Sequence, residues 1–195
     1  MKTKVLSLLI VFASFNCFAQ EKEPRLGIEV NERTSFAIKK LDDAKMKVGF
    51  GFEGILHYRF YKHLEAYAGW GWNYFSSEDS FAGENCDFEE TGYMFGLQFK
   101  HTIWDSPISY YVRAGGLWNH IEIENIDGNI IEDTKHGLGY QLAGGVYIPI
   151  GKNWSFNTGL IFNSLNRKNI VFSDNIKRTL DLKYLSLRVG IIKMF

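Results

Sequence analysis

The chain has 195 residues with a formal net charge of +0 at pH 7; 16% of its residues are aromatic, 19 are glycine and only 3 are proline. This length corresponds to one domain, and the composition favours β-structure. The even balance of charge excludes a broadly basic surface, so we expect no nucleic-acid partner.

The first 19 residues have the pattern of an export signal. Lys2 and Lys4 form a positive end, residues 5–15 are an apolar run, and Ala19 is a small residue at the expected cleavage point. A membrane-spanning helix needs about 20 apolar residues, so this run is too short for an anchor. We therefore predict a cleaved signal peptide over residues 1–19.

The remaining chain predicts a single exported domain over residues 21–195, because it has no tandem repeat and no low-complexity linker. Cleavage would remove Lys2, Lys4 and Cys17, leaving 20 basic residues, 22 acidic residues and one cysteine, Cys86. An internal disulfide is then impossible. A lipid anchor on Cys17 is disfavoured, because bulky residues precede it.

Alternation of apolar and polar residues with a period of two predicts β-strands through the rest of the chain. Successive side chains of a strand point to opposite faces. In residues 48–60, for example, Phe50 and Phe52 share one face, while Gly51 and Glu53 share the other. In chain order, the predicted strands are 26–33, 48–60, 64–74, 93–100, 110–119, 138–148, 154–163 and 185–195.

The connections between these segments alternate in length. Those near Tyr61, Ser106 and Gly151 are short, whereas the other connections are long and polar, around residues 41, 80, 127 and 169. Short turns on one side and long loops on the other are typical of barrels that span a membrane. We predict an all-β fold, an eight-stranded antiparallel up-and-down transmembrane β-barrel, with its termini on the periplasmic side.

The residue sizes on the two faces predict which face meets lipid. The polar face carries most of the glycines, and an eight-stranded barrel has a lumen just wide enough for side chains to fill. Phe50, Trp70 and Phe95 belong to the other, bulky face. We therefore expect a packed polar lumen without a wide pore. The alternative is a soluble periplasmic lipid-binding barrel with the faces reversed, but glycine would weaken its exposed face.

The last segment, residues 185–195, is an alternating strand that ends in Phe195. With this ending the chain resembles the small OmpA/OmpX-type outer-membrane barrels of Gram-negative bacteria. The resemblance implies an outer-membrane location, contact with outer-membrane lipid and lipopolysaccharide, and a role for Phe195 as the signal read by the barrel-insertion machinery. Lys193 lies on the predicted lipid face, where a charge is tolerated only near the interface.

Inside the barrel, we predict an ion pair between Arg59 and Glu65. A turn centred on Lys62 places these residues opposite each other, with His57 opposite Tyr67. The expected role of this pair is structural, because it would hold the polar lumen together. A gate for ions is the alternative.

Catalytic chemistry on this scaffold requires a nucleophile or activated water beside a positioned base. The candidates are His120 and His136, flanked by Glu122, Glu124 and Asp133, and no compact Ser/His/Asp cluster accompanies them. We therefore predict no catalytic residue, no cofactor and no metal site. A structural or surface-interaction role is the preferred function, and a lipid A-modifying enzyme is the alternative.

The segment 76–90 is predicted to be a hydrated outer loop. It holds six acidic residues and no basic one, but it lacks the regular ligand spacing of a calcium loop. We expect Phe81 and Phe88 to be exposed there as contacts for an extracellular partner. Cys86 would be free to pair with another chain.

Overall fold

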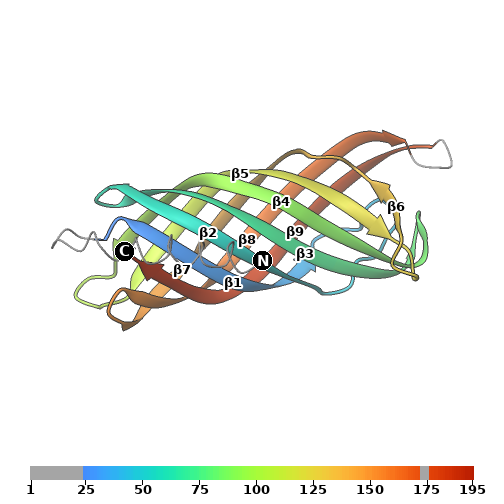
Figure 1. Ribbon diagram of the computed structural model, residues 1–195. Helices are drawn as coiled ribbons and strands as arrows, with labels where there is room; N and C mark the ends of the chain where they lie inside the picture. Colours follow the sequence, from blue (N-terminus) through green and yellow to red (C-terminus); the bar gives the residue numbers. More distant parts are fainter. Residues whose placement is uncertain (1–23, 172–175) are drawn as a thin grey trace, which may run out of the picture.

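The structure, a computed structural model, describes residues 24–171 and 176–195 (Figure 1). The predicted signal peptide lies outside the described residues. Within them the chain forms strands and no helix long and apolar enough to cross a membrane. The strands are β1 (Leu26–Ala37), β2 (Gly49–Tyr61), β3 (Leu64–Ser80), β4 (Gly83–Thr102), β5 (Ser109–Glu124), β6 (Ile130–Asp133), β7 (Gly137–Gly151), β8 (Trp154–Val171) and β9 (Lys177–Met194).

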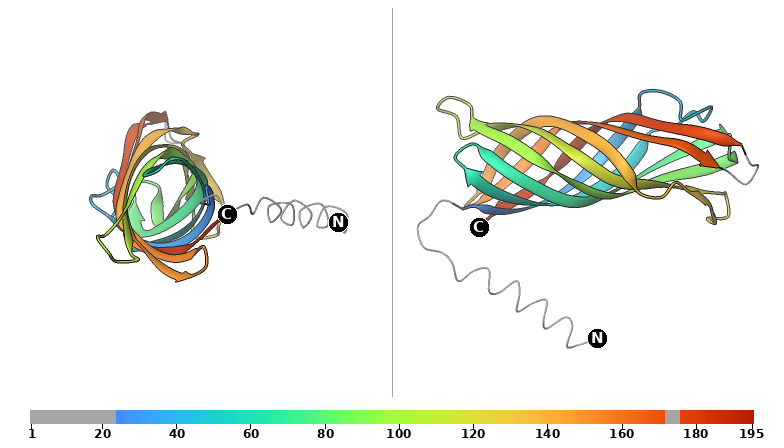
Figure 2. Two further views of the ribbon diagram at one scale, coloured as in Figure 1. Left: turned by 90° about the vertical axis from the view of Figure 1, so that its left-hand side faces the viewer. Right: turned by 90° about the horizontal axis from the view of Figure 1, so that it is seen from above.

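Eight of these strands close into a ring, as predicted. The hydrogen-bonded order is β4-β3-β2-β1-β9-β8-β7-β5, and β4 also pairs with β5, so every neighbour in the ring is antiparallel. Figure 2 shows this ring from one end. The short strand β6 pairs with the last residues of β5, beyond the stretch of β5 that pairs with β7.

The strands are staggered around the barrel. From Glu32 on β1, cross-strand partners lead through β2 and β3 to Thr91 on β4. In the other direction they lead through β9, β8, β7 and β5 to His101. His101 also lies on β4, ten residues after Thr91. Such a stagger requires tilted strands, as Figure 1 shows.

The two ends of the barrel differ. The short connections at residues 62–63, 103–108 and 152–153 lie at one end with Arg25 and Phe195, and we call this the turn end. At the turn end, the Arg25 amide donates to the Phe195 carbonyl at 2.9 Å, which joins the first and last strands. The β1–β2, β3–β4 and β5–β7 connections lie at the opposite end, which we call the loop end.

The predicted assignment of the two faces is confirmed. Polar residues such as Glu53, which is 0% exposed, point inward, whereas Phe50 is 59% exposed. Outward apolar side chains form a belt around the ring. Exposed members include Leu26, Val30, Phe36, Phe52, Leu56, Tyr58, Phe60, Trp70, Tyr93, Phe95, Leu97, Val112, Leu142, Leu160, Leu187, Val189 and Ile191.

Close packing explains why glycine gathers on the inner face. A Cβ on Gly190 would lie 2.1 Å from Asn31 Oδ1 and 2.2 Å from the Val30 carbonyl oxygen. One on Gly145 would lie 2.2 Å from the Thr158 carbonyl oxygen. No larger side chain fits at these points without moving backbone.

The predicted outer loop over residues 76–90 is wrong. β3 continues to Ser80 and has 17 residues, and β4 begins at Gly83 and has 20, so this segment is the outer part of a long hairpin. Gly83 follows the two-residue turn at φ 125°, and Asn85 has φ 51° in β4 where the pairing with β3 is irregular. Glycine and asparagine tolerate these backbone conformations.

The expected exposure of Phe88 and Cys86 is also wrong, because strand alternation continues through the hairpin. Both side chains point inward at the loop end, where each is 1% exposed. They pack beside Phe75, while Phe81 is partly buried against the same cluster. Cys86 is therefore not available to pair with another chain.

Candidate functional site: the lumen and the loop-end rim

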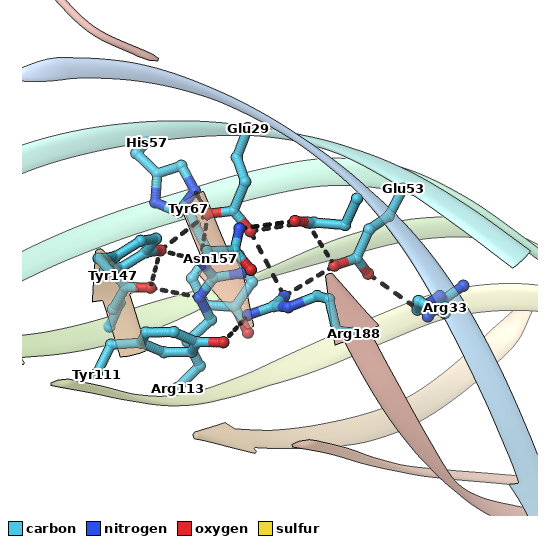
Figure 3. Close-up of polar contacts among 12 residues, drawn as sticks. Glu29, Arg33, Glu53, His57, Tyr67, Tyr111, Arg113, Tyr147, Asn157 and Arg188 are labelled. Atoms are coloured by element: carbon cyan, nitrogen blue, oxygen red, sulfur yellow. Dashed lines mark hydrogen bonds and ion pairs between the residues drawn. The ribbon is translucent and has the colours of Figure 1, made fainter. Parts of the chain in front are cut away.

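A buried ion network fills the middle of the lumen, and Glu29 is its centre (Figure 3). Glu29 Oε2 accepts hydrogen bonds from Arg113 Nη2 at 2.6 Å and from the Tyr147 hydroxyl at 2.8 Å. His57 Nε2 lies 3.0 Å from the same oxygen, and Arg188 Nη1 lies 3.6 Å from Oε1. One carboxylate therefore joins side chains from four other strands.

Glu53 is the second buried carboxylate of this network. It accepts a hydrogen bond from Arg188 Nη1 at 2.8 Å and lies 3.5 Å from Arg33 Nη1. Asn31 Nδ2 bridges the two acids, with distances of 2.7 Å to Glu29 and 2.9 Å to Glu53. Because each charge has opposite charges or hydrogen-bond donors beside it, the network compensates for the loss of water.

Tyrosines complete the packing around the arginines. The Tyr111 hydroxyl accepts a hydrogen bond from Arg188 Nη2 at 2.5 Å. The Arg113 guanidinium lies 5.3 Å from the centre of the Tyr67 ring and 4.9 Å from that of Tyr111. All of these side chains are buried. The polar half of the lumen is therefore filled by side chains that hold one another in place.

The register predicted for Arg59 and Glu65 is confirmed, since the two residues are cross-strand partners, as are His57 and Tyr67. Glu65 accepts a hydrogen bond from Gln98 Nε2 at 2.6 Å and lies 3.5 Å from His57 Nδ1. Arg59 Nη2 donates to the Pro24 carbonyl at 2.5 Å. The ion pair between Arg59 and Glu65 stays a prediction.

The loop-end half of the interior holds a large apolar cluster beside a few buried polar side chains, and the sequence analysis missed this cluster. The β1–β2 loop folds over it, and Leu41 and Ala44 of that loop are both 0% exposed. The apolar residues of this loop were the available signal. We call the cluster the apolar cap; it comprises Leu41, Ala44, Phe75, Cys86, Phe88, Met94, Leu117, Ile121, Ile123, Leu165, Leu180 and Leu182.

Outside the cap, an acidic sector occupies the loop-end rim over β4, β5 and β6. Glu89, Glu122 and Asp133 are consecutive cross-strand partners on these three strands. His120 Nδ1 lies 3.0 Å from Asp133 Oδ1 and 3.7 Å from Glu122 Oε1. The ligand atoms of His120, Glu122 and Asp133 all lie within 4.8 Å, as do those of Glu89, Glu122 and Glu124, so either group could hold a cation.

The charges of this sector influence one another. Partial burial and the nearby carboxylates of Glu89 and Glu122 raise the pKa of Glu124. Burial also acts to raise the pKa of Asp133, but hydrogen bonds from His120 and the Lys135 amide hold it below its ordinary value. Asp133 is thus stabilised as an anion by its two hydrogen-bond donors.

The two histidines proposed as enzyme candidates lie together at this rim. Their rings stack with centroids 4.4 Å apart, and His136 also stacks on Trp118 at 6.3 Å. In the described part of the chain, no serine or cysteine is hydrogen-bonded to either histidine. The geometry therefore supplies a histidine–aspartate contact without a nucleophile beside it.

A basic sector lies on the β1–β2 loop and the first residues of β9, which contact each other. Lys39 is paired with Asp181, and Arg178 Nη1 lies 3.1 Å from Asp42 Oδ2. Exposed lysines at 40, 45 and 177 add positive charge, and among the described residues none of these three makes an ion pair. The rim is therefore polarised, with positive charge on the β1–β2 loop and β9 and negative charge over β4, β5 and β6.

A closed ring of tilted strands with an apolar outer belt and a charged interior defines a transmembrane β-barrel. Residues 5–190 match the family described as outer membrane protein beta-barrel domain, and the chain belongs to this family. It is thus a small outer-membrane β-barrel protein, and its place is the outer membrane. No curated protein matches the chain.

Solved structures of small outer-membrane barrels share the fold. Neisserial surface protein A matches with a TM-score of 0.65 and 13% identity over 87% of this chain and 97% of its own. OprG from Pseudomonas aeruginosa matches with a TM-score of 0.58 and 12% identity over 89% of this chain and 97% of its own. Ail, the attachment invasion locus protein of Yersinia pestis, matches with a TM-score of 0.55 and 16% identity over 89% of this chain and 100% of its own. That structure is a complex with the heparin analogue sucrose octasulfate.

Proposed function

We propose that this protein is a non-catalytic outer-membrane barrel with a closed lumen that acts through its loop-end rim. The observation that carries the proposal is the filling of the interior by two successive buried layers, the ion network and the apolar cap. Solute passage would require both layers to open. The groups available to a partner are the polarised charges of the rim, which we place on the outer side of the cell.

We infer that the partner is an anionic saccharide bound by the basic sector. Lys40, Lys45 and Lys177 are exposed and form no described ion pair, so their charges are available to phosphate or sulfate groups. The structural neighbour Ail was solved with a heparin analogue, which supports the same chemistry here. Lipopolysaccharide phosphates and sulfated glycans are the two sources of such groups.

The binding test uses folded protein in lipid vesicles and calorimetric titration with sucrose octasulfate or purified lipopolysaccharide. We expect the triple variant Lys40→Gln, Lys45→Gln, Lys177→Gln to bind at least about tenfold more weakly, with a reduced dependence on salt. The matched control neutralises Lys62 and Lys152 at the turn end and should bind as the wild type. Equal affinity of both variants would contradict the proposal that the basic sector is the binding site. Whichever ligand binds identifies the source of the anionic groups, lipopolysaccharide or a sulfated glycan.

Two further measurements address the closed lumen and the enzyme alternative. In planar bilayers we expect no stable open channel, because water has no continuous path through side chains packed this way. A steady conductance would contradict the closed lumen. In cells with and without the protein, we expect the same lipid A mass profile, and a modified profile would instead support the lipid A-modifying enzyme.

A further inference from the structure

An acidic side chain interrupts the apolar belt on β1. The outward residues of this strand are Leu26, Ile28, Val30, Glu32, Thr34 and Phe36, so apolar positions lie on both sides of Glu32 along the strand. Its cross-strand neighbours are Phe52 on β2 and Val189 on β9, each 46% exposed. Glu32 is itself exposed and therefore faces the hydrocarbon part of the membrane.

Glu32 has no partner among the residues that the structure describes. No hydrogen bond or ion pair among the described residues includes its carboxyl group. The inward glutamates differ completely in this respect, because Glu29 and Glu53 each contact several cations and donors. An ionisable group exposed to lipid is costly and marks a functional contact when it is retained.

The surface beside Glu32 is open. Gly54 on β2 is the partner of Val30, one outward position from Glu32 along the belt, and a Cβ placed on Gly54 would meet nothing within 4 Å. The backbone is therefore bare at this point, with Trp70 of β3 on its far side. A neighbouring barrel can approach closely here, as small residues allow in membrane interfaces generally.

We propose that the outward face of β1, with β2 and β9 beside it, is the interface of a homodimer in which the two Glu32 side chains bind each other. Two copies inserted in the same direction are related by a two-fold axis along the membrane normal. This symmetry places both Glu32 residues at the same depth. Two neutral carboxyl groups then each donate one hydrogen bond and accept one, which satisfies both groups without water.

A second copy fits this face better than another kind of partner. A different protein would have to supply a polar group at the depth of Glu32, whereas a second copy supplies it automatically. A lipid headgroup lies at the interface, outside the belt in which Val30 and Phe36 flank Glu32. The bare backbone at Gly54 lies on the same face, so close approach and hydrogen bonding occur together.

The first test measures association by energy transfer between labelled copies in lipid vesicles, as the protein-to-lipid ratio is varied. We expect Glu32→Leu to weaken dimerisation about tenfold, the loss expected for two membrane hydrogen bonds. Glu32→Gln should retain most of the association, because two amides can pair in the same way. The control Leu160→Val, also outward in the belt but on β8, should not change it.

The second test uses oxidative cross-linking in a Cys86→Ala background. Glu32→Cys should form a disulfide-linked dimer in vesicles, whereas Leu160→Cys should not. Folding of every variant is verified by heat-modifiable gel migration. Wild-type protein that stays monomeric, Glu32→Leu that associates as tightly as the wild type, or equal cross-linking at both positions would overturn the proposal.

Discussion

Glu29 is the residue on which the charge balance of the lumen depends most. Its carboxylate contacts Arg113, Arg188 and His57 at once, and all four side chains are 0–1% exposed. Glu29→Gln preserves the shape but leaves two buried guanidinium groups without this anion. We expect a loss of about 3–5 kcal/mol in the free energy of unfolding, measured by urea titration in lipid vesicles. Exposed Glu84→Gln should change it by less than about 0.5 kcal/mol.

Gly190 tests whether the inner face requires glycine. Gly190→Ala would place a methyl group against Asn31 and the Val30 backbone at about half a normal contact distance, so strand β9 would have to shift. We expect slower assembly and a lower urea midpoint. The matched substitution is Gly144→Ala, where the nearest atom is 3.6 Å away. Equal effects of the two substitutions would show that space is not the reason for glycine at 190.

Among the elements, the β3–β4 hairpin is held by its inward aromatic side chains. Phe88 is 1% exposed and packs in the apolar cap beside Phe75. Phe88→Ala would remove about 3–5 kcal/mol of stability, as for other large-to-small changes in packed interiors. The urea midpoint and proteolysis of the hairpin would report the loss. Ile126→Ala, in an exposed loop, is the control and should leave both unchanged.

Alternation was sufficient to predict which residues of each strand point inward, as Glu53 and Phe52 show. It could not predict where strands end, because inward Phe75 and Phe88 are stabilised by the cap and not by local pattern. Nor could it predict pairings inside the lumen. Glu29 and Arg113 lie 84 positions apart, and only the closed ring brings them together. Contacts of this range leave no local signal.

For the whole molecule, the membrane position follows from the apolar belt. Leu160→Arg would place a charge in the belt and cost about 2–4 kcal/mol, whereas the same change near an interface costs about 0–1 kcal/mol. We therefore expect Leu160→Arg to reduce the fraction of folded, heat-modifiable protein in vesicles. Asn166→Arg, at an exposed position on the same face of β8 nearer the loop end, should fold as the wild type. Identical folding of both would contradict the position of the belt.

The polarised rim shows how little of the function the sequence alone could indicate. The chain as a whole is electrically neutral, and the basic and acidic sectors separate only when the ring brings the β1–β2 loop beside β9 and β4 beside β5. Likewise, Glu32 is one acid among 22 until the fold assigns it to the lipid face. Its position in an alternating strand was the signal that the sequence analysis passed over.

The reactivity of the buried Cys86 thiol reports how often the loop end of the barrel opens. A thiol reagent in solution reaches this sulfur only while the apolar cap is separated, since the side chain is 1% exposed in the closed barrel. The labelling rate of the wild-type protein therefore measures how frequently the apolar cap separates, and no probe has to be introduced. A partner that binds the rim and holds the cap closed would lower the labelling rate of Cys86, and membrane strain that separates the cap would raise it.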